Sequence, residues 1–221
     1  MKLSKLLFLS GGLLSLASAS QAQETHFALH VEQQPLALSS SNQNINLDYG
    51  TFHIRLGEQI SPDTRIDLIL GNSGGSTEKY PDTTGLDFEG IFGGFNLTGA
   101  LLDKPWFQLN YNLHYTYHNL AHEAETQTSR FVWHELGGEI EFKTHLYQNT
   151  FVYACARYVD IKGQLLQEGT IQSDTNFRQG NHHSQCAGIY MESGVDGYYG
   201  VELHNSEAVG GSIYFGRFLD M

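Results

Sequence analysis

The stretch from Trp106 to Asn119 most strongly limits what this chain can fold into. From Phe107 onward its residues alternate between an aromatic or leucine residue and a polar one. A repeat of two residues is typical of a β-strand with two unlike faces. The apolar face holds Phe107, Leu109, Tyr111, Leu113, Tyr115 and Tyr117, and the polar face holds Gln108, Asn110, Asn112, His114, Thr116 and His118. Such a strand suits a soluble sandwich with the apolar face inside, or a membrane barrel with the apolar face outside.

Residues 1–22 have the pattern of a secretory signal peptide. Two lysines precede an apolar run over residues 6–16, and small residues then offer cleavage after Ala19 or after Ala22. A transmembrane helix needs about 20 apolar residues, which neither this run nor any later segment provides. We therefore expect an exported chain whose residues 23–221 form one β-barrel domain.

Composition favours strands and excludes one class of partner. Without the leader, 10 basic residues stand against 24 acidic ones, so the charge is 10 − 24 = −14 with neutral histidines. Nucleic acid is an unsuitable partner, because phosphate binding needs clustered Lys and Arg. The 24 glycines, 12 tyrosines and 13 phenylalanines, with only 4 prolines, are typical of strands and turns.

The mature chain divides into about ten strand-like runs with alternating short and long connections. The expected strands are 25–33, 47–58, 64–70, 86–98, 106–119, 130–143, 150–162, 184–193, 198–204 and 211–218. Short turns are expected at 60–63, 102–105, 147–149 and 195–197, and long polar loops at 38–46, 71–85, 120–129 and 163–183. Short turns at one end and long loops at the other are typical of outer-membrane barrels.

The sixth run distinguishes the soluble sandwich from the membrane barrel. Val132, Leu136, Ile140 and Phe142 face one way, whereas Trp133 and three glutamates face the other. Three carboxylates are costly in an apolar core but tolerable in a lumen with arginines and water. The expected polar lumen network is His53, Arg55, Asp67, Gln108, Asn110, His114, His118, Glu135, Glu139, Glu141, Arg157 and Arg217. In the seventh run Phe151, Tyr153, Val159 and Ile161 share a face with Arg157, so the sequence leaves its register open.

The leader, the amphipathic runs and the closing segment Ser212–Phe218 together resemble the small bacterial outer-membrane β-barrel proteins. In that family the last strand carries aromatic residues spaced two apart, as Tyr214, Gly216 and Phe218 nearly do here, but Leu219, Asp220 and Met221 extend beyond them. The resemblance covers the mature chain. It implies an all-β, antiparallel, up-and-down transmembrane barrel of about eight to ten strands, located in the outer membrane. Its implied partners are membrane lipid, lipopolysaccharide and the barrel-assembly machinery, with an extracellular ligand at the loops. Phe107, Leu109, Tyr111, Leu113, Tyr115 and Tyr117 would then face lipid. A soluble periplasmic barrel is the alternative.

Eleven histidines raise the question of a metal site. His114 and His118 share a face, but residues four apart in a strand are about 13 Å from each other. His182 and His183 are adjacent but have no evident third ligand, whereas zinc needs three or four. We expect no metal and no cofactor.

One short motif raises the question of catalysis. His204-Asn205-Ser206 has the His-x-Ser spacing that resembles the active site of outer-membrane lipid A deacylases, in which a Ser, a His base and a Glu hydrolyse an ester. In that family an Asn follows the Ser and the Glu comes later. Here Glu207 follows Ser206, and Asp220 is the one later carboxylate. The other interpretation is a turn beside a lumen histidine.

Cys155 and Cys186 flank the longest expected loop in a chain bound for an oxidising compartment. A disulfide at the base of that loop is one expectation, and two separate buried thiols are the other.

These patterns indicate an architecture more strongly than an activity. We expect a non-enzymatic structural or interaction protein with a lumen filled by polar side chains. The alternatives are an acyl hydrolase using His204 and Ser206, a narrow channel for small polar solutes, and a soluble periplasmic binding protein.

Overall fold

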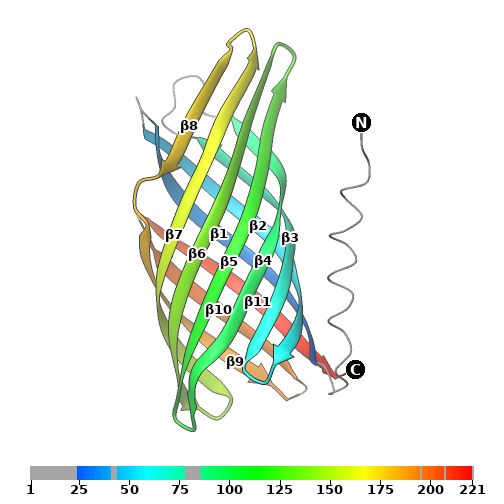
Figure 1. Cartoon of the computed structure of the whole chain (residues 1–221), viewed down its shortest axis with the longest axis vertical. Helices are drawn as coiled ribbons and strands as arrows, with labels where there is room; N and C mark the ends of the chain where they lie inside the picture. Colours follow the sequence, from blue (N-terminus) through cyan, green and yellow to red (C-terminus); the bar gives the residue numbers. More distant parts are fainter. Residues whose placement is uncertain (1–23, 41–43, 78–85, 195, 207, 221) are drawn as a thin grey trace.

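The computed structural model describes residues 24–40, 44–77, 86–194, 196–206 and 208–220. Their eleven strands form one antiparallel sheet that closes into a barrel (Figure 1). The strands are β1 (Glu24–Ser40), β2 (Asn44–Ser61), β3 (Thr64–Thr77), β4 (Asp87–Lys104), β5 (Phe107–Ala124), β6 (Gln127–Tyr147), β7 (Thr150–Gly169), β8 (Ser173–Gln179), β9 (His183–Ser193), β10 (Gly197–Asn205) and β11 (Val209–Asp220). Within these ranges, no helix is long and apolar enough to cross a membrane. The expected leader, residues 1–22, lies outside the described residues.

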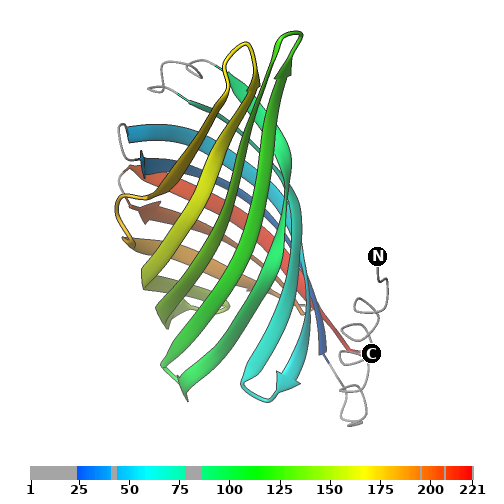
Figure 2. The same ribbon diagram turned by 45° about the horizontal axis from the view of Figure 1, so that its top comes forward.

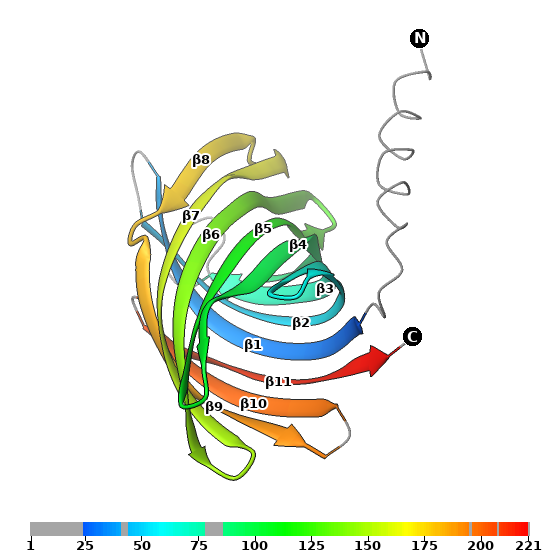
Figure 3. The ribbon, with the colours of Figure 1, turned by 60° about the horizontal axis from the view of Figure 1, so that its bottom comes forward.

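A ring of ten strands forms the body of the barrel. It runs from β1 through β7, continues with β9, β10 and β11, and closes by antiparallel pairing of β11 with β1. This last pairing extends from Glu24 opposite Asp220 to Gln33 opposite Gly211. The beginning of β1 and the end of β11 lie at the same end of the barrel as the short turns (Figure 3). We call this end the turn end. The closed antiparallel barrel confirms the predicted fold class.

The eleventh strand, β8, closes a second and narrower ring. The last residues of β8 pair with residues 38–40 of β1, and most of β8 pairs with residues 162–167 of β7. The part of the barrel that contains β8 consists of β1 to β8 alone, because β9, β10 and β11 do not extend this far from the turn end. The barrel thus passes from ten strands at the turn end to eight at the opposite end, where β5 to β8 project furthest (Figure 2). We call this opposite end the hairpin end.

The predicted long loops are the main error of the sequence analysis. Residues 120–129 extend β5 and β6 almost to their tip, and only residues 41–43 separate β1 from β2. The expected loop 163–183 contains the end of β7 and all of β8. The physical reason is that these Ser-, Asn- and Thr-rich segments still place several apolar side chains inward, as Leu38, Ile45 and Leu120 show, beside buried polar residues such as Ser129 and Gln167.

Those inward side chains fill the hairpin end with an apolar core. Phe88 packs edge-on against Phe131 with ring centroids 4.8 Å apart, and Phe131 in turn meets Phe177 of β8 at 5.7 Å. Gly163 of β7 leaves the space into which the Phe177 ring fits. Among the described residues, the buried members of this core are Leu36, Leu38, Ile45, Leu47, Tyr49, Phe88, Leu120, Phe131, Trp133, Val159, Ile161, Leu165 and Phe177.

At the turn end and in the seventh strand, the structure agrees better with the predictions from the sequence. Gln148 and Asp196 adopt positive φ angles of 45° and 52° in the expected turns after β6 and β9. The open question of β7 is resolved, since Tyr153, Val159 and Ile161 are buried on the inner face, and Arg157 lines the cavity from the same face.

Candidate functional site: a polar cavity beneath the apolar core

A cavity of about 420 Å³ occupies the ten-strand part of the barrel. On the side of the hairpin end, a layer of aromatic rings bounds the cavity. In this layer His118 stacks on Trp133 with ring centroids 4.4 Å apart, and Tyr49 meets both of them edge-on. At the other end Gln108 and Lys143 line it, close to the short turns. The barrel interior therefore changes from apolar at the hairpin end to polar at the turn end.

Most of the predicted lumen residues line this cavity. They are His53, Arg55, Gln108, Asn110, His114, His118, Glu135, Glu139, Glu141 and Arg157. Asp67 is fully buried beside it.

Arg217 does not belong to this set, and its predicted place in the lumen is wrong. It is exposed on the outer face of β11, opposite Phe27 and Gly197. The reason is strand parity: Tyr214 and Phe218 line the cavity, so Arg217 between them must point outward. Its position near the turn end leaves the guanidinium accessible to solvent.

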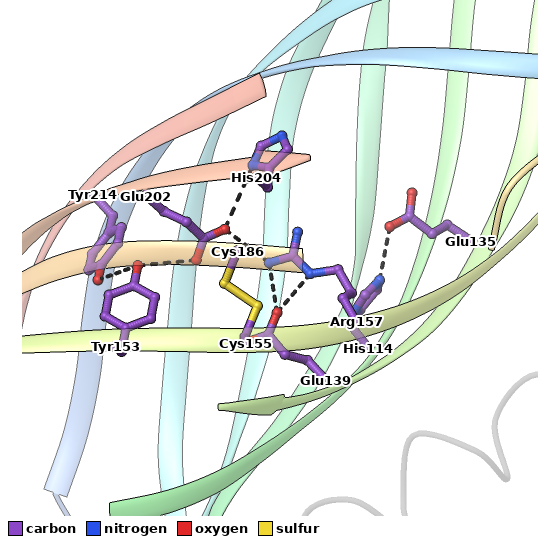
Figure 4. A network of polar contacts seen from close by, with 10 residues as sticks. All are labelled: His114, Glu135, Glu139, Tyr153, Cys155, Arg157, Cys186, Glu202, His204 and Tyr214. Atoms are coloured by element: carbon purple, nitrogen blue, oxygen red, sulfur yellow. Dashed lines mark hydrogen bonds and ion pairs between the residues drawn. A yellow bond between two sulfur atoms is a disulfide. The ribbon is translucent and has the colours of Figure 1, made fainter. Parts of the chain in front are cut away.

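Arg157 is the centre of a buried polar network (Figure 4). Its Nη2 lies 2.7 Å from Glu139 Oε2 and 3.1 Å from Glu202 Oε1. The Tyr153 hydroxyl donates to the other oxygen of Glu202 at 3.1 Å, and the Tyr214 hydroxyl donates to Tyr153 at 3.2 Å. One guanidinium thereby ties β6, β7 and β10 together along one wall of the lumen.

Two further carboxylates bind side chains of β5. His114 Nε2 lies 2.9 Å from Glu135 Oε1, and Asn110 donates to Glu141 at 2.9 Å. These contacts join β5 to β6 on the inner face, as the alternation in both segments predicts.

A second cluster lies across the lumen near the turn end. Asp67 Oδ1 accepts from His26 Nδ1 at 2.7 Å and lies 2.9 Å from Arg65 Nε. The other ring nitrogen of His26 contacts the hydroxyl of Tyr198. His26, Glu202 and Tyr198 were absent from the predicted lumen network, although their alternation with outward residues was the available signal. Tyr153 was placed on the face of Arg157, but the register of that strand was left open.

A row of stacked rings runs around the cavity wall. Phe92 stacks on His118 at 4.8 Å and meets His53 edge-on at 5.4 Å, and His53 stacks on His30 at 4.8 Å. Phe92 and His53 belong to β4 and β2, which are separated by β3. They meet because β3 has Gly71 between them, where an added Cβ would lie 2.5 Å from His53 Cβ and 2.8 Å from Phe92 Cε1.

Cys155 and Cys186 are directly opposite each other on β7 and β9 and form a disulfide, with Cα atoms 4.9 Å apart. The residues that the structure describes hold one group of three metal-ligand types in close range, namely these two cysteines with Glu139. Because both sulfurs are in the disulfide, this group does not form a metal centre.

The His-x-Ser motif lies at the end of β10. His204 is buried, packs against Gly210, and has its Nδ1 3.7 Å from Glu202 Oε1. Among the described residues, no hydrogen bond joins His204 to Ser206, whose carbonyl accepts from Asn181 at 3.4 Å. Glu207 lies outside the described residues.

The outer surface of the ten-strand ring is apolar. Leu113, Tyr115 and Tyr117 are exposed there, while Phe107, Leu109 and Tyr111 are half-buried near the turn end. Other exposed residues of this band are Phe52, Leu56, Ile66, Leu68, Leu70, Ile91, Phe95, Leu136, Ile140, Phe142, Ile189, Tyr199, Val201, Leu203, Ile213 and Phe215.

A closed antiparallel barrel with an apolar exterior and a polar, charged lumen in its ten-strand part has the fold of the outer-membrane β-barrels. No family model and no curated protein sequence matches the chain. Among solved structures, the translocator domain of the autotransporter NalP from Neisseria meningitidis is similar, with a TM-score of 0.50 and 10% identity, over 96% of this chain and 94% of that one. The β-domain of the Bordetella autotransporter BrkA is similar with a TM-score of 0.50 and 12% identity, over 91% and 100%. At this level of identity the similarity concerns the fold alone.

Proposed function

We propose that the chain is a non-conducting barrel of the bacterial outer membrane with a structural or interaction role. The exposed apolar band would face lipid, with the short turns in the periplasm and the hairpin end outside the cell. The leader pattern and the barrel fold both support this location. The lipid-facing role of Phe107, Leu109, Tyr111, Leu113, Tyr115 and Tyr117 is part of the same proposal.

The observation that carries the non-conducting role is the apolar core across the narrow ring. Phe88, Leu120, Phe131 and Leu165 each have 0% of their surface exposed, so no water path passes between them. An ion or polar solute crossing this layer would have to give up hydration among these apolar side chains, which is costly. This core argues against the alternative of a narrow channel.

The interaction role follows from the shape of the hairpin end. β5, β6, β7 and β8 extend beyond the ten-strand ring, and their tips are polar. Since the core holds these hairpins in one arrangement, they offer a preformed surface to lipopolysaccharide or to a ligand outside the cell.

Conductance measurements test the closed lumen. The purified, folded protein inserted into planar lipid bilayers should give no steady unitary current at 100 mV in 1 M KCl, conditions that we choose to reveal even a narrow pore. An open barrel of known conductance, inserted under the same conditions, serves as the control. Reproducible unitary steps from the wild-type protein would contradict the proposal and favour the channel.

A further inference from the structure

The charges that line the cavity are distributed unevenly. We call the contiguous inner wall formed by β6, β7, β9, β10, β11 and β1 the glutamate wall. Five carboxylates face the cavity from it, against two permanent cations, Lys143 and Arg157. The carboxylates are Glu32, Glu135, Glu139, Glu141 and Glu202. With neutral histidines, three negative charges have no basic counterpart on this wall, and the other permanent cations that line the cavity, Arg55 and Arg65, lie on β2 and β3.

Glu32 is the least satisfied of these carboxylates. It makes no hydrogen bond or ion pair with any residue that the structure describes, although Arg157, Glu202 and Glu135 all lie within electrostatic reach. In the strand register Ser212 separates Glu32 from Glu202, so the two carboxylates flank a small side chain. This leaves room in front of them.

Buried acceptors without donors are a second and independent sign of a missing ligand. His118 and Asn96, which are 2% and 1% exposed, line the cavity, and His118 Nδ1 and Asn96 Oδ1 have no partner among the described residues. Leaving such groups unpaired is costly, whereas a ligand with N–H groups would satisfy them.

From these observations we infer that the cavity is a binding site for a small organic cation with two or more amino groups, which enters from the turn end. Its ammonium groups would bind Glu32 and the neighbouring carboxylates. The tyrosine rings of the wall, such as Tyr153 and Tyr214, add aromatic faces that attract cations. This site is independent of the conductance of the barrel.

The geometry favours an organic cation over a metal ion. A bound metal ion needs several ligand atoms within one coordination sphere. The glutamate wall offers no such group of three in the described part of the chain, apart from the one whose sulfurs form the disulfide. Carboxylates spread over several strands suit amino groups spaced along a flexible chain.

Calorimetric titration of the folded protein in a non-ionic detergent tests the inference, with the triamine spermidine as probe. The wild-type protein should show saturable binding near one equivalent. The E32Q variant should bind about tenfold more weakly or worse, because a charged hydrogen-bond partner is lost. Glu32 is the appropriate target, since its replacement breaks no contact with a described residue.

The E123Q variant is the matched control, because Glu123 is exposed near the tip of β5 and far from the cavity. It should bind spermidine as the wild-type protein does. Absence of saturable binding to the wild-type protein, or equal affinity of the wild-type and E32Q proteins, would overturn the inference. Magnesium ions that bind more tightly than spermidine, and do so through Glu32, would overturn the assignment to an organic cation. Because none of these results depends on current through the barrel, they fail or succeed separately from the proposed function.

Discussion

At the scale of single residues, Arg157 has the most demanding position. Its guanidinium is shared by Glu139 and Glu202, and all three side chains are less than a fifth exposed. In the R157M variant both carboxylates would lose their counterion in a poorly hydrated lumen. We expect the free energy of unfolding, measured by urea titration in detergent micelles, to fall by about 3–5 kcal/mol.

Two further variants make this prediction specific. The R130M variant removes an exposed arginine and should change stability by less than about 0.5 kcal/mol. The triple variant R157M/E139Q/E202Q should recover much of the loss, because it removes the unpaired charges as well. If R157M were as stable as R130M, the network would contribute nothing to the fold.

Gly71 has a steric role that can be tested in the same way. Replacing it with Ala places a methyl group between His53 and Phe92, and we expect a loss of about 1–3 kcal/mol from overpacking. Gly74 of the same strand is the control, since an added Cβ there finds its nearest atom at 3.4 Å. Equal urea midpoints for G71A and G74A would show that the stacked rings move aside without cost.

The sequence was informative about individual side chains where two faces alternate. His114, Glu135 and Glu139 could be assigned to the lumen because the residues that alternate with them on the other face are mostly apolar. Arg217 could not be assigned in this way, because both faces of β11 carry aromatic residues. The sequence alone does not show which of these two faces is the inner one. The partners of each charge, such as Glu202 for Arg157, depend on the ring order of strands, which local alternation does not contain.

At the scale of strands, the disulfide joins β7 directly to β9 and encloses β8. The closed loop has a sequence separation of 31 residues. On a chain-entropy argument, a link of this length stabilises the folded state by about 2–4 kcal/mol.

The C155S/C186S variant should therefore unfold at a lower urea concentration than the oxidised wild-type protein. Reduction of the wild-type protein should produce a shift of the same size. Identical midpoints for oxidised and reduced protein would contradict this role of the disulfide.

The strand β8 shows why part of the fold escaped the sequence analysis. The segment Ser173–Gln179 is short and polar, with Phe177 as its one large apolar residue. Its strand conformation depends on pairing with β7 and β1 and on the burial of Phe177, which are non-local. The same holds for the extended hairpins, in which polar composition indicated loops while inward Leu38 and Leu120 fixed strands. By contrast, the turns that contain Gln148 and Asp196 could be predicted because they depend on local backbone preferences.

At the scale of the whole molecule, the two halves of the barrel interior do different things. The ten-strand ring holds charged and aromatic side chains around a cavity, and the eight-strand ring is packed like the core of a soluble protein. This division explains how a barrel wide enough for a cavity can still be closed at one end. The exposed apolar band around the ten-strand ring then requires a lipid environment, because a surface of that extent is not stable in water.

The membrane location is tested most directly by electrophoresis of the outer-membrane fraction from cells that express the full chain. A folded transmembrane barrel resists sodium dodecyl sulfate until it is boiled. We therefore expect the protein in this fraction to migrate at different positions before and after boiling. Recovery of the protein in the soluble periplasmic fraction, with the same mobility in both samples, would contradict the account and favour a soluble barrel.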